Sequence, residues 1–252
     1  MKANNTLTQT IDVLYEDDDC AVINKPAGLL VHPLPGHNIN NTLVEWWLHY
    51  PGVDSNNWPE PLRAGVVHRL DKDTSGAILL AKHKEALLFL QSQFYERVVE
   101  KHYQSLCWDK PANTKGKVTS LISRNRNNRT KRVTSLINFT DSEAKEASSL
   151  YDVLKIYTYK SNTTSLIHWQ ILTGRTHQIR LHAKMLNCPI LGDPDYSIKP
   201  SRILTQALKI ERQLLHCEYL VFNRPGDHKR ITAQAPMADD ILSTISKLSP
   251  NE

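Results

Sequence analysis

Pairs of short apolar segments joined by polar turns are the feature that most restricts the fold of this chain. Residues 11–15 alternate between apolar and polar side chains, and residues 20–25 form a second apolar run after a short acidic turn. Residues 150–159 and 164–172 repeat this arrangement. Short alternating or apolar segments on both sides of a short turn are typical of antiparallel strand pairs.

Helical patterns are interleaved with these strand pairs. Residues 84–97 place Leu87, Leu90 and Phe94 on one apolar stripe, which predicts an amphipathic helix. Further helices are expected over residues 43–48, 202–213 and 238–248, a helix or a loop-to-helix element over 173–186, and a polar linker over 140–149. Because hairpin-like pairs dominate, the sequence predicts an α+β fold with a mixed, largely antiparallel sheet flanked by helices.

The composition is that of a globular, moderately basic chain. Of 252 residues, 40% are hydrophobic and 23% charged, and the net charge of +5 permits a polyanionic partner without requiring one. The four cysteines are widely spaced with no CxxC pair, so neither a zinc ribbon nor a disulfide framework is indicated. No apolar run approaches the ~20 residues of a membrane helix. Residues 1–10 lack the apolar core of a signal peptide, so a cytoplasmic protein is expected.

One polar stretch concentrates reactive side chains. Residues 68–76 read His-Arg-Leu-Asp-Lys-Asp-Thr-Ser-Gly and are followed at once by the apolar run 77–81. A polar turn that leads into a buried strand can hold a reactive group still. Without further information, an ordinary charged turn explains the same residues.

Two other segments are basic. Residues 123–132 contain five cations and no acid, which fits either a solvated loop or a loop that contacts phosphates. In the predicted helix over 173–186, a spacing of three and four residues places His177, Arg180 and Lys184 on one face. Both segments are candidates for contact with a nucleic acid.

Several kinds of site are not indicated. The sequence has no GxGxxG, GxxxxGK[ST], GxSxG or HExxH pattern. His177 and His182 are five residues apart, which suits opposite faces of a helix, so no metal is expected. An acid in a tight turn, a distant arginine on a helix, Tyr103 on an alternating strand over 100–108 and basic loops remain. This set fits chemistry on a nucleic acid by a single carboxylate.

Three segments, in order and at matching spacing, resemble the signature motifs of the RluA/RluD family of RNA pseudouridine synthases. They are residues 24–33 (Asn-Lys-Pro-Ala-Gly-Leu-Leu-Val-His-Pro), the stretch 68–76, and residues 174–182 (Gly-Arg-Thr-His-Gln-Ile-Arg-Leu-His). The run 191–193 (Leu-Gly-Asp), followed by Tyr196, fits the same pattern. The resemblance covers roughly residues 11–236 and is greatest to the large-subunit rRNA enzymes of RluD type.

The resemblance implies a pseudouridine synthase fold, with one catalytic domain over 11–252 after a loose start at 1–10. An S4 RNA-binding domain, common in RluD-type enzymes, is not expected. The implied reaction converts uridine to pseudouridine without a cofactor. By position, Asp71 is the catalytic aspartate, Arg180 pairs with it, and Tyr103 stacks on the flipped uracil.

The resemblance and the basic segments together predict the residues that contact RNA. They are Lys25, His68, Arg69, Arg124, Arg129, Lys131, Arg175 and His177.

The expected partner is RNA, with no membrane and no protein partner indicated. The RluD likeness favours 23S rRNA, whereas the expected lack of an S4 domain favours tRNA as an alternative. A non-catalytic RNA-binding module on the same fold is a further alternative. Asp71, Tyr103 and Arg180 argue against it, because a module without activity does not need all three.

Overall fold

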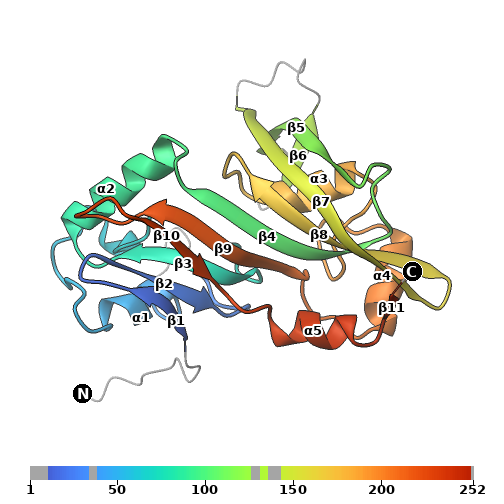
Figure 1. Cartoon of the computed structure of the whole chain (residues 1–252), viewed down its shortest axis with the longest axis horizontal. Helices are drawn as coiled ribbons and strands as arrows, with labels where there is room; N and C mark the ends of the chain where they lie inside the picture. Colours follow the sequence, from blue (N-terminus) through green and yellow to red (C-terminus); the bar gives the residue numbers. More distant parts are fainter. Residues whose placement is uncertain (1–10, 34–38, 126–130, 136–142, 251–252) are drawn as a thin grey trace. The chain divides into compact units, whose positions relative to one another are not determined.

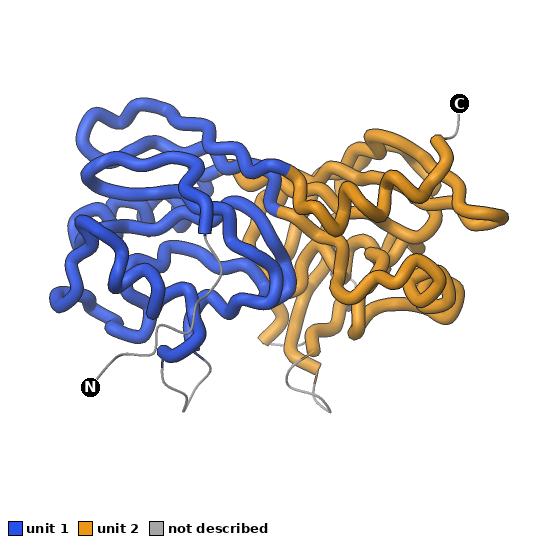
Figure 2. The backbone as a smooth tube through the Cα atoms, turned by 90° about the horizontal axis from the view of Figure 1, so that it is seen from below, with its two compact units in different colours: residues 1–99, 217–236 blue, residues 100–216, 237–252 orange. Residues whose placement is uncertain are grey.

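The computed structural model of the protein describes residues 11–33, 39–125, 131–135 and 143–250. The chain divides into two compact units, which Figure 2 shows in different colours. Unit 1 comprises residues 1–99 and 217–236, and unit 2 comprises residues 100–216 and 237–252. Both contain strands and helices, as an α+β fold requires (Figure 1).

Unit 1 contains the first predicted strand pair. Its strands follow the order β1-β2-β3-β9, and β10 pairs with β9. The strands are β1 (Val13–Glu16), β2 (Cys20–Lys25), β3 (Ser75–Ala81), β9 (Leu215–Asn223, in unit 1 from Cys217 onward) and β10 (Arg230–Gln234). Because β1 and β2 pair antiparallel, the predicted hairpin is confirmed.

Strand β3 is the central strand on which this unit is built. All seven of its residues are buried, which explains its continuous run of small and apolar side chains. Gly76 lies near its start with φ +110°, and a Cβ atom there would lie 2.1 Å from the carbonyl oxygen of Cys217. Glycine is therefore required at this position both by the backbone conformation and by the neighbouring strand.

Unit 1 has two helices where the sequence predicts them and one short 3-10 helix where none is predicted. They are α1 (Leu43–Leu48), the 3-10 helix η1 (Pro61–Arg63) and α2 (Lys84–Tyr95). Thr42 caps α1 by accepting a hydrogen bond from the N–H of Glu45. Leu87 and Leu90 of the predicted apolar stripe are buried, so the stripe faces the core.

Unit 2 contains a run of antiparallel strands. Their order is β4-β8-β7-β5-β6, and β11 pairs with β7. The strands are β4 (Glu100–Trp108), β5 (Lys115–Arg124), β6 (Arg132–Ser135), β7 (Lys145–Tyr159), β8 (Asn162–Ile171) and β11 (Ser249–Pro250). The predicted pairing of 150–159 with 164–172 is confirmed. The linker predicted over 140–149 is wrong from residue 145 onward, because pairing with β5 extends β7 through these polar residues.

Three helices cover parts of unit 2: α3 (Gln178–Met185), α4 (Lys199–Ala207) and α5 (Asp239–Ile245). A core cluster joins side chains from β4, β7, β8, α4 and α5, including Leu106, Leu166, Leu204 and Ile241. A smaller cluster packs Leu181 of α3 against Ile122 of β5 and Ala147 of β7. Helix α3 is thereby held against the strands.

His182 of α3 is expected to make the stability of the protein sensitive to acid. The ring is fully buried, with Nδ1 2.9 Å from Oγ of Ser149 and Nε2 3.2 Å from Oγ of Ser120. Burial lowers the pKa of His182 from 6.5 to about 4. Between these two values the unfolded chain binds a proton that the folded chain does not, so stability falls as the pH drops through this window.

The free energy of unfolding should therefore fall by about 3 kcal/mol more in the wild type than in His182→Gln between pH 6.5 and 4, because glutamine does not titrate. Chemical denaturation at several pH values measures this difference. Parallel pH profiles of the two proteins would contradict a buried, neutral His182.

Candidate active site

In unit 1, the stretch 68–76 forms a tight turn directly before β3. The carbonyl of Asp71 accepts a hydrogen bond from the N–H of Thr74 at 3.1 Å. The carbonyl of Lys72 accepts one from the N–H of Gly28 at 3.0 Å. The backbone on the C-terminal side of Asp71 is thus tied both to its own turn and to the segment that follows β2. The half-buried Asp71 side chain is carried by an ordered loop.

Lys25 has a role that differs from the predicted one. Its side chain is fully buried, and Nζ donates hydrogen bonds to three carbonyls, those of Pro26, Leu29 and Lys72, at 2.8, 2.8 and 2.9 Å. A fully buried ammonium in this position does not reach RNA, so the structure does not support the predicted RNA contact. Lys25 instead joins the first signature segment to the turn that carries Asp71.

Replacing Lys25 with methionine is expected to lower the free energy of unfolding by about 2 kcal/mol, because three carbonyls lose their donor. It should also lower kcat, because the turn that carries Asp71 loses one of its ties. Lys72→Met is the matched control, since the Lys72 side chain is exposed and its carbonyl remains. Weaker RNA binding by Lys25→Met with unchanged stability would instead favour the RNA contact.

The first two residues of the stretch are held in different ways. Nε2 of His68 accepts a hydrogen bond from the N–H of Leu79 at 2.9 Å, and the ring stacks on Phe94 with centroids 4.8 Å apart. These contacts attach the stretch to β3 and α2, and the contact of His68 with RNA stays a prediction. Arg69 is exposed and lies with one guanidinium nitrogen 3.0 Å from Nε2 of His32.

The state of His32 follows from its two contacts. Its Nδ1 lies 3.0 Å from the carbonyl oxygen of Pro33, to which it can only donate, so Nε2 accepts from Arg69. Burial, and after it the charges of Arg69 and Arg63, lower the pKa of His32. A neutral His32 thus orients Arg69 and leaves its charge intact.

Tyr103 and Arg180 lie in unit 2. Tyr103 is on β4, pairs with Trp169 of β8 and is 5% exposed. Arg180 is on α3 and is 4% exposed. Because Asp71 belongs to unit 1, its predicted pairing with Arg180 and its proximity to Tyr103 stay predictions.

Arg180 has two acidic partners that sequence reasoning missed. Its Nε and one terminal nitrogen donate to the two carboxylate oxygens of Asp193 at 2.7 and 2.8 Å. The same terminal nitrogen also donates to Asp195 at 2.8 Å. Asp193 in turn accepts hydrogen bonds from the N–H groups of Asp195 and Tyr196. The Leu-Gly-Asp run at 191–193 is the sequence feature that could have indicated this pairing. Its aspartate, Asp193, accepts hydrogen bonds from the backbone of the turn and from the Arg180 side chain.

Charge outweighs burial at Asp195. Burial raises the pKa of its carboxyl, but Arg180 and Lys131 lower it more, so the pKa lies below its ordinary value. Lys131 lies 3.3 Å from the Asp195 carboxylate. Lys131, a predicted RNA contact, therefore shares the ion-pair partner Asp195 with Arg180.

The other predicted RNA contacts of unit 2 lie partly in the same network. The hydroxyl of Tyr196 lies 2.8 Å from Nδ1 of His177 and accepts a hydrogen bond from the N–H of Arg132. Nε of Arg175 donates to the carbonyl of Glu146 at 3.0 Å. Arg124 is exposed at the end of β5, opposite Arg132, whereas Arg129 lies outside the described residues. Basic side chains are thus attached to the β5–β6 end and to the start of α3.

Gln178 holds the start of α3 in place. Its side-chain oxygen accepts from the hydroxyl of Thr173 and the N–H of Arg175, and its nitrogen donates to Ser148 and Ser149. All its hydrogen-bonding capacity is directed inward. This explains why the segment before α3 is an ordered loop, so that residues 173–186 form the loop-to-helix element, one of the two arrangements that the sequence predicts.

The described residues show neither a metal site nor a membrane-crossing helix. No group of three or more His, Cys, Asp or Glu side chains in the described parts of the chain is arranged to hold a metal ion. None of the described helices is long and apolar enough to span a bilayer.

Comparison with known proteins places these features in one family. A family model described as RNA pseudouridylate synthase matches residues 19–185. An uncharacterized RNA pseudouridine synthase of Chlorobaculum parvum is 38% identical over 249 residues, covering 94% of this chain and 74% of the relative. The ribosomal large subunit pseudouridine synthase D of Zymomonas mobilis is 35% identical over 233 residues, covering 92% and 70%.

Solved structures agree with the sequence comparisons. The structure of human RNA pseudouridylate synthase domain containing 1 superimposes with a TM-score of 0.73 at 25% identity, covering 96% of this chain and 89% of that one. The human domain containing 4 gives a TM-score of 0.71 at 26% identity. The predicted fold class is confirmed.

Proposed function

Because the chain belongs to the RNA pseudouridylate synthase family and is an isomerase that acts on RNA, we propose that Asp71 is its catalytic residue. The observation that supports this assignment is the construction of the turn. Lys25, Gly28 and His68 tie the backbone around Asp71 to β2 and β3. A carboxylate on so restrained a backbone is preorganised for reaction with a bound nucleotide.

The reaction needs no redox step and no phosphate transfer. The bond between C1′ and N1 of the uridine breaks, the uracil rotates, and a bond forms between C1′ and C5. The proton leaves C5, and N1 gains one. Asp71 in its ionised form attacks either C1′ or the base. In this proposal Arg180 favours the ionised form, and Tyr103 stacks on the uracil and assists proton transfer at C5.

Release of tritium from RNA labelled at C5 of uridine tests the proposed activity. Wild-type protein should release tritium in proportion to the pseudouridine formed. A target uridine within a stem must leave its stack before reaction, which costs a few kcal/mol. Substrates in which that uridine is unpaired should therefore react faster.

We favour 23S rRNA as the target, since relatives at 34–35% identity are named ribosomal large subunit pseudouridine synthase D. A cytoplasmic enzyme is consistent with this target. The alternative is tRNA. Mapping of pseudouridine in 23S rRNA and tRNA from cells with and without the gene distinguishes the two, because only the true target loses a modified position.

RNA binding should weaken as salt rises, because cations on the protein replace counterions of the phosphates. If exposed Arg124 contacts a phosphate, Arg124→Ala should reduce the slope of log K against log salt by about 1. Arg202→Ala is the control, since Arg202 is an exposed arginine of α4 outside the predicted contacts. Equal slopes for wild type and Arg124→Ala would remove Arg124 from the RNA interface.

A further inference from the structure

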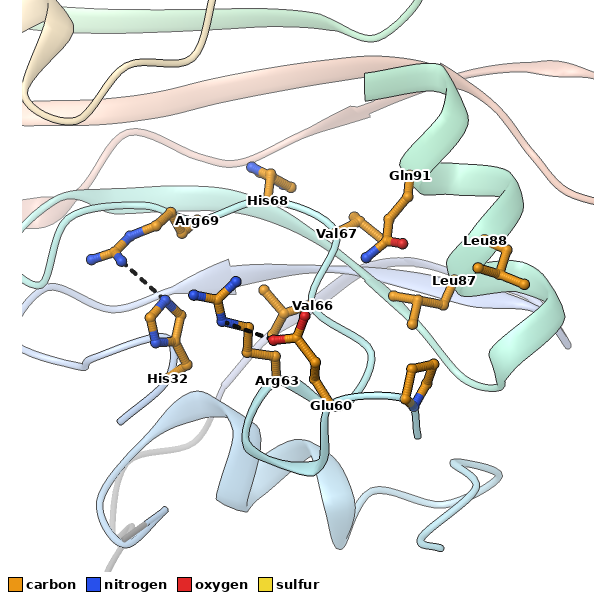
Figure 3. Close-up of a pocket in the computed structure, with 11 residues that line it drawn as sticks. His32, Glu60, Arg63, Val66, Val67, His68, Arg69, Leu87, Leu88 and Gln91 are labelled. Atoms are coloured by element: carbon orange, nitrogen blue, oxygen red, sulfur yellow. Dashed lines mark hydrogen bonds and ion pairs between the residues drawn. The ribbon is translucent and has the colours of Figure 1, made fainter. Parts of the chain in front are cut away.

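Unit 1 has a pocket of about 270 Å³ beside the stretch that carries Asp71 (Figure 3). Its walls come from His32, from Pro59, Glu60 and Arg63, from residues 66–69, and from α2. Arg69 lines the pocket and stands two residues before Asp71, so their Cα atoms are at most about 8 Å apart. A molecule in this pocket is therefore close to the proposed reaction centre.

The walls of the pocket differ in character. Val66, Val67, Leu87 and Leu88 supply apolar surface, and Leu88 is 54% exposed. Gln91 projects from α2 on the same side, as Figure 3 shows. Within the described parts of the chain its amide makes no hydrogen bond, so one donor group and one acceptor oxygen are open to a ligand.

Two guanidinium groups lie on the other side. Arg63 makes an ion pair with Glu60 at 3.5 Å, but both side chains are more than half exposed, so solvent screens this pair. Arg69 is oriented by neutral His32. Planar cations beside an apolar surface and an amide match an unpaired nucleobase, which stacks on arginine planes and presents hydrogen-bonding edges.

We infer that this pocket binds one unpaired nucleobase of the RNA substrate, close in sequence to the target uridine, with Arg63 and Arg69 near its phosphate. The inference rests on the proposed function, because it takes Asp71 as the reaction centre. The volume is below the roughly 300 Å³ at which pockets for larger ligands begin, which suits a single base. A nucleotide carries a phosphate that two arginines can bind, whereas an apolar side chain of a protein partner has no such group.

Binding of abasic RNAs tests the pocket independently of turnover. The probe is the short unmodified RNA that binds most tightly among pieces of 23S rRNA and tRNA. Each nucleotide is replaced in turn by an abasic one, and the dissociation constant is measured for Asp71→Asn protein. One position near the target uridine should weaken binding about tenfold, the scale of one stacked base.

The same series is then measured in the Asp71→Asn background with Gln91→Glu or Ser92→Glu. Gln91 lines the pocket, whereas Ser92, the next residue of α2, is exposed but does not line it. Both variants add one negative charge to α2, but only Gln91→Glu places that charge in the pocket. At the sensitive position, the increase in the dissociation constant caused by the abasic nucleotide should shrink to less than twofold with Gln91→Glu. It should remain about tenfold with Ser92→Glu. Such coupling shows that the base and Gln91 share a site.

Two outcomes separate this inference from the proposed function. If wild type forms no pseudouridine but the penalty depends on Gln91, the pocket is supported and the catalytic proposal is overturned. If wild type forms pseudouridine but no position couples to Gln91, the nucleobase pocket is overturned, and a protein segment becomes the better occupant.

Discussion

The Asp71→Asn protein is expected to form pseudouridine at least about a thousandfold more slowly than wild type, the scale on which enzymes lose activity without their nucleophile. Asparagine keeps the size of the side chain but lacks the negative charge that attack requires. RNA binding should persist, because the hydrogen bonds from Thr74 to the Asp71 carbonyl and from Gly28 to the Lys72 carbonyl join backbone groups, which the substitution keeps. Tritium release and filter binding on the same RNA measure the two properties.

Asp73→Asn is the matched control, because Asp73 belongs to the same turn and its substitution by asparagine also removes one negative charge. It should retain most of the activity. If the Asp73 variant is inactive and the Asp71 variant turns over RNA, the two aspartates have been assigned in the wrong order. If both variants lose activity equally, charge in the turn matters but a single catalytic carboxylate does not explain the reaction.

Arg180→Met is expected to lower the free energy of unfolding by about 3–5 kcal/mol, because it leaves a buried carboxylate without its cation. The Asp193 side chain is 1% exposed and accepts two hydrogen bonds from Arg180. Chemical denaturation measures the loss. Arg63→Met, which removes the exposed pair with Glu60, should cost no more than about 1 kcal/mol.

Two further variants separate the structural role of Arg180 from a catalytic one. The double variant Arg180→Met with Asp193→Asn should recover part of the lost stability, because no buried charge remains unpaired. Arg180→Lys keeps the charge but loses the two-pronged geometry. If Arg180→Lys is stable and inactive, Arg180 acts on the reaction itself. If activity follows stability in all three variants, its role is structural.

The local elements could be predicted from the sequence because their causes are local. The apolar run of residues 20–25 and the apolar stripe of Leu87 and Leu90 each depend on neighbours a few positions away. Prediction failed where pairing extended a strand through polar residues, as at the start of β7. There the hydrogen bonds come from β5, a partner that no local pattern contains.

The spacing of three motifs determined the family, and with it the proposed reaction and Asp71. The partners of the functional side chains were decided only by the tertiary structure. Lys25 bonds to the carbonyl of Lys72, 47 residues away, and so holds the turn instead of touching RNA. Arg180 is paired with Asp193 on a different segment. Side-chain charge can be read from the sequence, but burial and the geometry of hydrogen bonds depend on which distant segments the fold brings together.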